Sequence, residues 1–293
     1  MRILSKVLMS LCLLVVAGQG IAWAKDAAPS TEPLESVITM QVEGSIVIDP
    51  QGRVSGLTID TALPDKMRAP LDRTIRTWQF EPVIVDGAAR TASAKMRVIL
   101  SALAQGDSYQ VKIDNVVFPG ESGSDGAPPP LITAKTLQPP RYPPTLLYAG
   151  VSGTVLLAVR VGEDGQVAQV MAMQSALLDV KGDTSTLSKA VRMFEKSAID
   201  VAKGWRFNVG SREMAPSARE MTVMVPISYM IDGKKPVGPG KWRTEVRVPS
   251  RPISWLQDQP DIQAIGVDDV VDGEVLPVAG ELTLVTKVIG TTL

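Results

Sequence analysis

The sequence predicts an α+β fold of two small ββαβ domains, each with a helix packed on a short antiparallel sheet. Two observations predict this fold. A strand, a tight turn and a second strand occur twice, at residues 46–59 and 159–173, and an amphipathic helical stretch follows each pair. The chain has 293 residues and is 45% hydrophobic, so it is long enough and apolar enough for two cores.

Both expected hairpins turn on a glycine. The first turn reads Asp49-Pro50-Gln51-Gly52 and the second reads Glu163-Asp164-Gly165. Glycine adopts a positive φ without strain, and aspartate accepts hydrogen bonds from its own turn, so both stretches are typical of tight turns between antiparallel strands. We therefore interpret Asp164 as a turn residue and not as a metal ligand.

Both helical stretches end on the same aromatic pair. Apolar residues at helical spacing lead to a tryptophan and then to a phenylalanine: Leu71, Ile75, Trp78 and Phe80 in the first domain, and Ala198, Ala202, Trp205 and Phe207 in the second. Because the tryptophans lie on the apolar stripe, we expect them in the core and not stacked on a ligand. Each domain then closes with a strand, at residues 96–100 and 221–230.

Changes in composition set the expected boundaries. We expect a signal peptide at 1–24, a linker at 25–35, the first domain at 36–104, a linker at 105–136, the second domain at 137–233 and a tail at 234–293. The tail contains two strand-like runs, Thr244–Val248 and Glu281–Ile289. These runs either extend the sheet of the second domain or form a hairpin of their own.

The first residues are typical of an export signal. Arg2 and Lys6 form a basic start, an apolar run follows at Val7–Val16, and Ala22-Trp23-Ala24 places small residues at a cleavage site. The alternative is a membrane anchor that stays uncleaved, because the apolar stretch approaches the length of a membrane span.

The residue types that are missing exclude several kinds of chemistry. The chain has no histidine, and its one cysteine, Cys12, lies inside the expected signal peptide. The chain therefore lacks the base of a Ser-His-Asp or Cys-His triad and the usual ligands of a zinc site. We expect no enzyme, no metal site and no cofactor. A net charge of -1 offers no basic surface for nucleic acid. An acidic run, Asp268, Asp269, Asp272 and Glu274, lacks the spacing of a calcium loop and is expected to be a solvated loop.

The second domain resembles the C-terminal domain of the TonB family. The matching motifs are Pro140-Arg141-Tyr142-Pro143, Gly153-Thr154-Val155, Asp164-Gly165-Gln166-Val167, Met193-Phe194-Glu195-Lys196, Trp205-Arg206-Phe207 and Val223-Met224-Val225-Pro226-Ile227-Ser228-Tyr229. The first domain keeps the glycine turn and Trp78-Gln79-Phe80-Glu81-Pro82 but lacks the leading Tyr-Pro. We therefore interpret it as a degenerate copy of the second.

This resemblance implies a protein of the Gram-negative periplasm that serves transport and binds proteins, outer-membrane receptors among them. TonB proteins transduce energy through an uncleaved N-terminal helix and a long Pro-rich rod, whereas this chain has an expected signal peptide and short linkers. We therefore expect a periplasmic, non-enzymatic adaptor that captures extended protein segments by strand addition. The alternative is a TonB-type energy transducer for outer-membrane transport whose N-terminal segment stays uncleaved.

We predict the partner-binding site along the closing strand, at Val223, Val225, Pro226, Ile227 and Tyr229. A proline cannot donate to a strand ladder, which is typical of an edge strand, and an edge binds extended peptides through its main chain. The resemblance implies the same kind of contact with a receptor segment. The C-terminal tail or a second copy of the chain, forming a homodimer, are the alternative occupants of this edge.

The lead-in to the second domain is a second candidate. Tyr142 and Pro143 lie in a Pro-rich stretch that restricts the backbone to extended conformations. The pair is either a rigid support whose tyrosine packs on the domain or part of the recognition surface.

Overall fold

The computed structural model describes residues 33–85, 87–106, 108–119, 131–211, 215–231, 237–257, 266–267, 273–278 and 282–293. The expected signal peptide lies outside the described residues, as do Asp268, Asp269 and Asp272 of the acidic run. Residues 33–293 form one compact unit. No helix in this described part is long and apolar enough to cross a bilayer.

In the first half of the chain, one strand lies between two others. β1 (Glu35–Ile48) pairs with β2 (Val54–Ile59) on one side and with β5 (Ala92–Gln105) on the other. β6 (Ser108–Val117) then pairs with the far side of β5. The remaining elements of this half are α1 (Asp65–Arg76) and the two strands of a small hairpin, β3 (Val83–Val85) and β4 (Ala88–Arg90).

The second half repeats this arrangement around β8 (Ser152–Val161). β8 pairs with β9 (Val167–Leu178) on one side and with β11 (Thr222–Tyr229) on the other. α3 (Thr184–Ala202) begins at Asp183, whose side chain accepts a hydrogen bond from the N–H of Thr186. The remaining elements are α2 (Pro144–Tyr148), β7 (Ile132–Thr136) and β10 (Arg206–Val209), of which the two strands form a separate pair.

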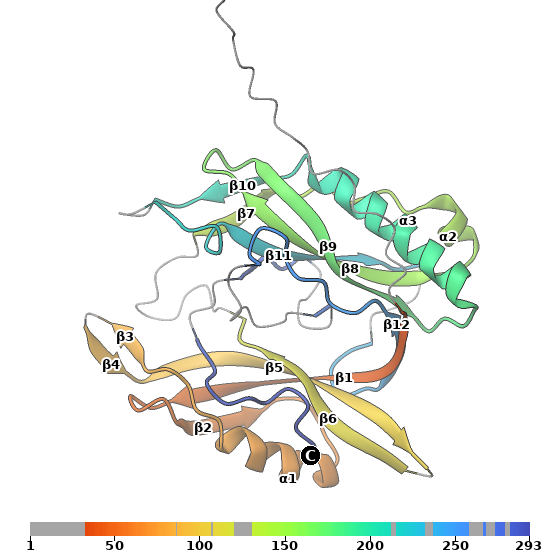
Figure 1. Ribbon diagram of the computed structural model, residues 1–293. Helices are drawn as coiled ribbons and strands as arrows, with labels where there is room; N and C mark the ends of the chain where they lie inside the picture. Colours follow the sequence, from red (N-terminus) through yellow and green to blue (C-terminus); the bar gives the residue numbers. More distant parts are fainter. Residues whose placement is uncertain are drawn as a thin grey trace, which may run out of the picture. The chain divides into compact units, whose positions relative to one another are not determined.

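The described residues are mostly β, and one antiparallel sheet of nine strands dominates them (Figure 1). The tail supplies β12 (Arg243–Arg247), which pairs with β1 on one side and β9 on the other, and β13 (Leu276–Pro277), which pairs with β11. The strand order is therefore β13-β11-β8-β9-β12-β1-β5-β6, with β2 on β1. The prediction of two separate ββαβ sheets is wrong, because β12 joins the sheets of the two halves.

The two glycine turns pack on the aromatic residues that follow the helices. Gly52 and Gly165 both have a positive φ, as the turns predict. The carbonyl of Gly52 accepts a hydrogen bond from the N–H of Phe80 at 2.7 Å, and that of Gly165 accepts one from Phe207 at 2.9 Å. This contact explains why a glycine turn and a Trp-x-Phe motif occur together in both halves.

Two core clusters lie beneath the helices. Trp78 and Phe80 are buried in the first with Leu71 and Ile75 of α1, and Trp205 is buried in the second with the apolar face of α3. The expectation that both tryptophans belong to the core is confirmed.

A third core cluster lies on the face of the second half that α3 does not cover. Side chains alternate along a strand, so Val155 and Leu157 of β8 face α3 whereas Leu156 and Ala158 face away from it. Tail residues cover this second face: the cluster consists of Val117, Leu156, Ala158, Met173, Ala176, Met224, Ile253, Leu256, Val267, Leu276 and Val278. The unbroken apolar run at residues 155–159 is the sequence signal of a strand buried on both faces.

Charged side chains attach the tail to both halves. Arg247 of β12 donates to both carboxylate oxygens of Asp114 on β6, at 2.7 and 3.1 Å. Arg251 donates to Glu195 of α3 at 2.9 Å. The expected linker at 105–136 supplies strands β6 and β7, and the first expected run of the tail forms β12. The second run includes residues 283–286, which bond along Gln79–Glu81.

Candidate functional site

The closing strand β11 directs four of its predicted site residues into the core. Val223, Val225, Ile227 and Tyr229 are at most 5% exposed and belong to the cluster beneath α3. The whole of β11 pairs with β8 on one side. A partner strand would therefore contact the main chain of β11 on its other side, and these side chains support the strand from within.

The main-chain groups of β11 alternate between β8 and the opposite side of the strand. The N–H of Val278 in the tail donates to the carbonyl of Thr222 at 3.0 Å, so Thr222 faces away from β8. Successive residues point their main-chain groups to opposite sides, so Met224 and Pro226 share the outer side with Thr222. The missing N–H of Pro226 therefore removes no bond to β8, which explains why this strand tolerates a proline.

The tail occupies part of this outer side. β13 is antiparallel to β11, with Pro277 opposite Val223 and Leu276 opposite Met224. Trp255 of the tail adds a side-chain hydrogen bond to Thr222, from Nε1 to Oγ1 at 3.0 Å. The ladder between β13 and β11 extends over two residues of each strand.

The second candidate, Tyr142 and Pro143, meets the first through an aromatic cluster. The ring of Tyr142 lies edge-on to Tyr229, with centroids 5.6 Å apart, and edge-on to Phe194 at 5.7 Å. Its hydroxyl donates to the carbonyl of Val151. Pro143 is buried and precedes the first turn of α2. The geometry is that of a support whose tyrosine packs on the fold.

The hydroxyls of both tyrosines act as hydrogen-bond donors. Burial raises the pKa of Tyr229 to about 12, and its hydroxyl donates to the carbonyl of Phe194 at 3.1 Å. Burial raises the pKa of Tyr142 as well. Both hydroxyls are therefore protonated donors at neutral pH, and neither can serve as a base.

The sequence interpretation missed a charged contact next to this edge. Arg97 of β5 is 7% exposed, and its Nη1 lies 3.2 Å from Oε2 of Glu274, which is two residues before β13. The acidic run suggested only a solvated loop at this position. A basic residue among the apolar residues of the strand expected at 96–100 is the sequence signal that could have pointed to such a contact.

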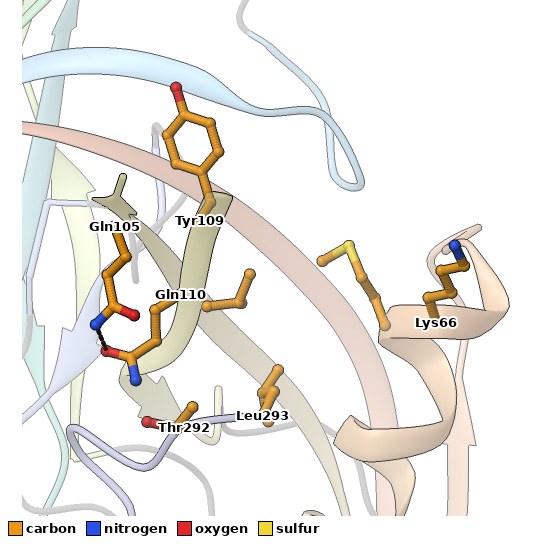
Figure 2. Close-up of a pocket in the computed structure, with 8 residues that line it drawn as sticks. Lys66, Gln105, Tyr109, Gln110, Thr292 and Leu293 are labelled. Atoms are coloured by element: carbon orange, nitrogen blue, oxygen red, sulfur yellow. Dashed lines mark hydrogen bonds between the residues drawn. The ribbon is translucent and has the colours of Figure 1, made fainter. Parts of the chain in front are cut away.

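A shallow pocket lies near the other end of the sheet. It has a volume of about 310 Å³ and is lined by Lys66, Met67, Gln105, Tyr109, Gln110, Val111, Thr292 and Leu293. Figure 2 shows Lys66 on α1 across the pocket from Gln105 and Gln110, whose side chains share a hydrogen bond of 3.3 Å. These residues form no acid–base or nucleophile–base pair, so the pocket does not resemble an active site.

The turn carboxylates are engaged by their own turns. Asp49 accepts from the N–H groups of Gln51 and Arg53, and Asp164 accepts from the N–H of Gln166. These backbone hydrogen bonds lower the pKa of both aspartates. Across the described ranges, no three Cys, Asp or Glu residues cluster as metal ligands would.

Two curated relatives are similar to this chain. Both are named Protein TonB and come from Xanthomonas campestris pv. campestris, one from strain B100 and the other from strain ATCC 33913. Each is 30% identical over 101 residues, which is 34% of this chain and 39% of the relative. The similarity to TonB proteins extends over about a third of this chain. It matches less than half the length of these relatives, and neither a family model nor a solved structure matches it.

Proposed function

We propose that this chain is a non-enzymatic, TonB-like protein of the periplasm that binds an extended segment of another protein by strand addition to β11. The similarity to TonB proteins supports this function. The observation that carries the proposal is the outer side of β11. There the described part of the tail pairs with two residues, whereas β8 pairs with the whole strand on the other side. The segment of an outer-membrane receptor is the partner that the family resemblance favours.

The first half supports strand addition at this edge. β5 lies beside β1 as β11 lies beside β8, and Met96, Val98 and Leu100 face the first core as the site residues of β11 face the second. β5 pairs with an antiparallel strand, β6, from Arg97 to Gln105. The edge that corresponds to β11 therefore accommodates a full added strand within this molecule.

We also infer that residues 36–104 of the first half and residues 137–233 of the second are repeats of one TonB-like unit. Both have the first hairpin strand at the centre, the second on one side and the closing strand on the other. Both place a positive-φ glycine on the phenylalanine that follows the helix. These shared contacts support the repeat, and the missing Tyr-Pro marks the first half as the degenerate copy.

An energy transducer is the second candidate function, and the similarity to proteins named TonB favours it equally. The state of the N-terminus decides between the two. The protein is isolated from the cell envelope and its N-terminus is determined by mass analysis. A protein that begins at Lys25 excludes an anchored transducer. An intact segment from Met1 in the inner membrane excludes the exported adaptor.

Strand addition is tested with the full exported chain. Synthetic peptides from the N-termini of outer-membrane receptors of the same organism are added to ¹⁵N-labelled protein, and amide shifts are recorded. We expect perturbations centred on residues 221–231 and on the tail residues that face them. Shifts confined to the first half, or no shift with any receptor peptide, would refute the proposed function.

A further inference from the structure

A short segment of the tail contacts the proposed edge as a partner strand would. We call residues 273–278 the latch segment; it consists of Gly273, Glu274, Val275, Leu276, Pro277 and Val278. It runs antiparallel to β11, and the N–H of Val278 donates to the carbonyl of Thr222. Its main chain therefore uses the outer side of β11, the side to which a partner strand would bind.

The side chains of the latch segment pack on both faces of the sheet next to β11. Leu276 and Val278 belong to the third core cluster, together with Met224 of β11. Val275 packs against the cluster beneath α3. The segment therefore fills the apolar positions next to the strand as well as its main-chain groups.

Glu274 ties the latch segment to the other half of the molecule. Its carboxylate lies 3.2 Å from the guanidinium of Arg97 on β5, across a separation of 177 positions in the sequence. Arg97 is almost completely buried, so this ion pair is shielded from solvent more than a surface pair. The pair holds the start of the segment in place.

The ladder of the latch segment is nevertheless short. In the described part of the chain the pairing with β11 covers two residues, whereas β6 pairs with β5 from Arg97 to Gln105. Elements with few main-chain bonds open locally at a lower free energy than long ladders do. The chain's own strand therefore pairs with fewer residues on the outer side of β11 than on the corresponding side of β5.

We propose that the latch segment is a built-in competitor, which covers the β11 edge and must leave it before a partner strand binds. This inference rests on the proposed function, because it names what regulates access to the same edge. The Glu274–Arg97 ion pair and the Val278–Thr222 hydrogen bond set how readily the segment leaves. Weakening either contact raises the affinity for an added strand.

The test uses a fluorescein-labelled hexapeptide, GEVLPV, which copies the latch segment and can bind β11 only where the native segment has left. Its affinity is measured by anisotropy for the full exported chain and for two variants. Glu274→Gln removes the charge that faces Arg97, and Val278→Pro removes the N–H that Thr222 accepts. Glu163→Gln is the matched control, because it removes the same charge from an exposed turn.

We expect each latch variant to bind the hexapeptide about tenfold more tightly than the wild type, and the control to bind as the wild type does. The amide signal of Val278 should shift in the wild type and in Glu274→Gln as the hexapeptide binds. Equal affinity for all four proteins overturns the inference, as does an unchanged Val278 signal. A receptor peptide that binds β11 while the Val278 signal stays unchanged overturns only the latch and leaves the proposed function standing.

Discussion

At the scale of single residues, Gly52 and Gly165 allow each glycine turn to pack closely on the phenylalanine that follows the helix. A Cβ atom at Gly52 would lie 2.0 Å from the carbonyl oxygen of Phe80, and one at Gly165 would lie 2.2 Å from that of Phe207. Gly87 has the same φ as Gly165, +74°, and no heavy atom lies within 4 Å of its Cβ position. Gly87 therefore separates the cost of the backbone conformation from the cost of the clash.

We expect Gly165→Ala and Gly52→Ala each to lower the free energy of unfolding by at least about 2 kcal/mol more than Gly87→Ala does. Urea denaturation of the three variants measures this difference. Equal losses in all three would mean that the turn does not need to pack on the aromatic residue.

Glu245 is a residue at which we expect the stability of the joined sheet to depend on pH. Its side chain has no exposed surface, and it lies on β12 between β1 and β9. Burial raises the pKa of Glu245, while Arg243 at 3.7 Å and Arg247 at 4.0 Å oppose the rise and Asp114 adds to it. The pKa of Glu245 is therefore higher in the folded protein than in the unfolded chain. This difference stabilises the folded protein in full at a pH below the unfolded pKa. The stabilisation is lost as the pH rises through the folded pKa.

Replacing the titrating group should remove this dependence. As the pH rises from about 4 to 8, we expect the free energy of unfolding of Glu245→Gln to increase relative to that of the wild type. Chemical denaturation across this range tests the sign. Glu163→Gln is the control, and a difference between Glu245→Gln and wild type that stays constant with pH would contradict the assignment.

At the scale of the element, β11 shows how one strand serves both the core and a partner. Its odd-numbered residues fill the core beneath α3, and Pro226 lies with its missing N–H on the outer side. That proline removes one bond that a partner strand could otherwise accept. The affinity for a single short segment is therefore limited by the strand itself.

Pro226→Val should restore this donor without changing the ladder to β8. We expect a bound receptor peptide to gain about threefold to tenfold in affinity, which is the effect of one added hydrogen bond. Isothermal titration measures the gain, and Pro144→Val, at the exposed start of α2, is the control. An affinity that is unchanged in Pro226→Val would show that the peptide does not run along this side of the strand.

At the scale of the whole molecule, local features could be predicted from the sequence and the joined sheet could not. The turns at Gly52 and Gly165 and the helical stripes depend on near neighbours, so their patterns are visible in the sequence. The pairing of β12 with β1 and β9 brings together residues far apart in the chain, and no periodicity encodes it. The unbroken apolar run of β8 was the one local sign that a further layer covers the sheet.

The candidate site was predictable to a similar degree. Pro226 indicated a strand with one side away from the ladder, and the tail was one of the expected occupants. The contact between Arg97 and Glu274 was not predictable, because it joins the two halves through a segment of the tail. The sequence therefore offered the tail as one occupant beside β11 but did not reveal the ion pair that holds it there.

The central claim, that a partner strand adds antiparallel to β11, is tested most directly by disulfide cross-linking. A chain that begins at Lys25 has no cysteine, so in it Ser228→Cys and Ile231→Cys each introduce a single thiol. A bound receptor peptide carries one cysteine at each position in turn. We predict that the peptide position that links to residue 231 lies closer to the peptide N-terminus than the position that links to residue 228. The opposite order, or links without any order, would contradict the claim.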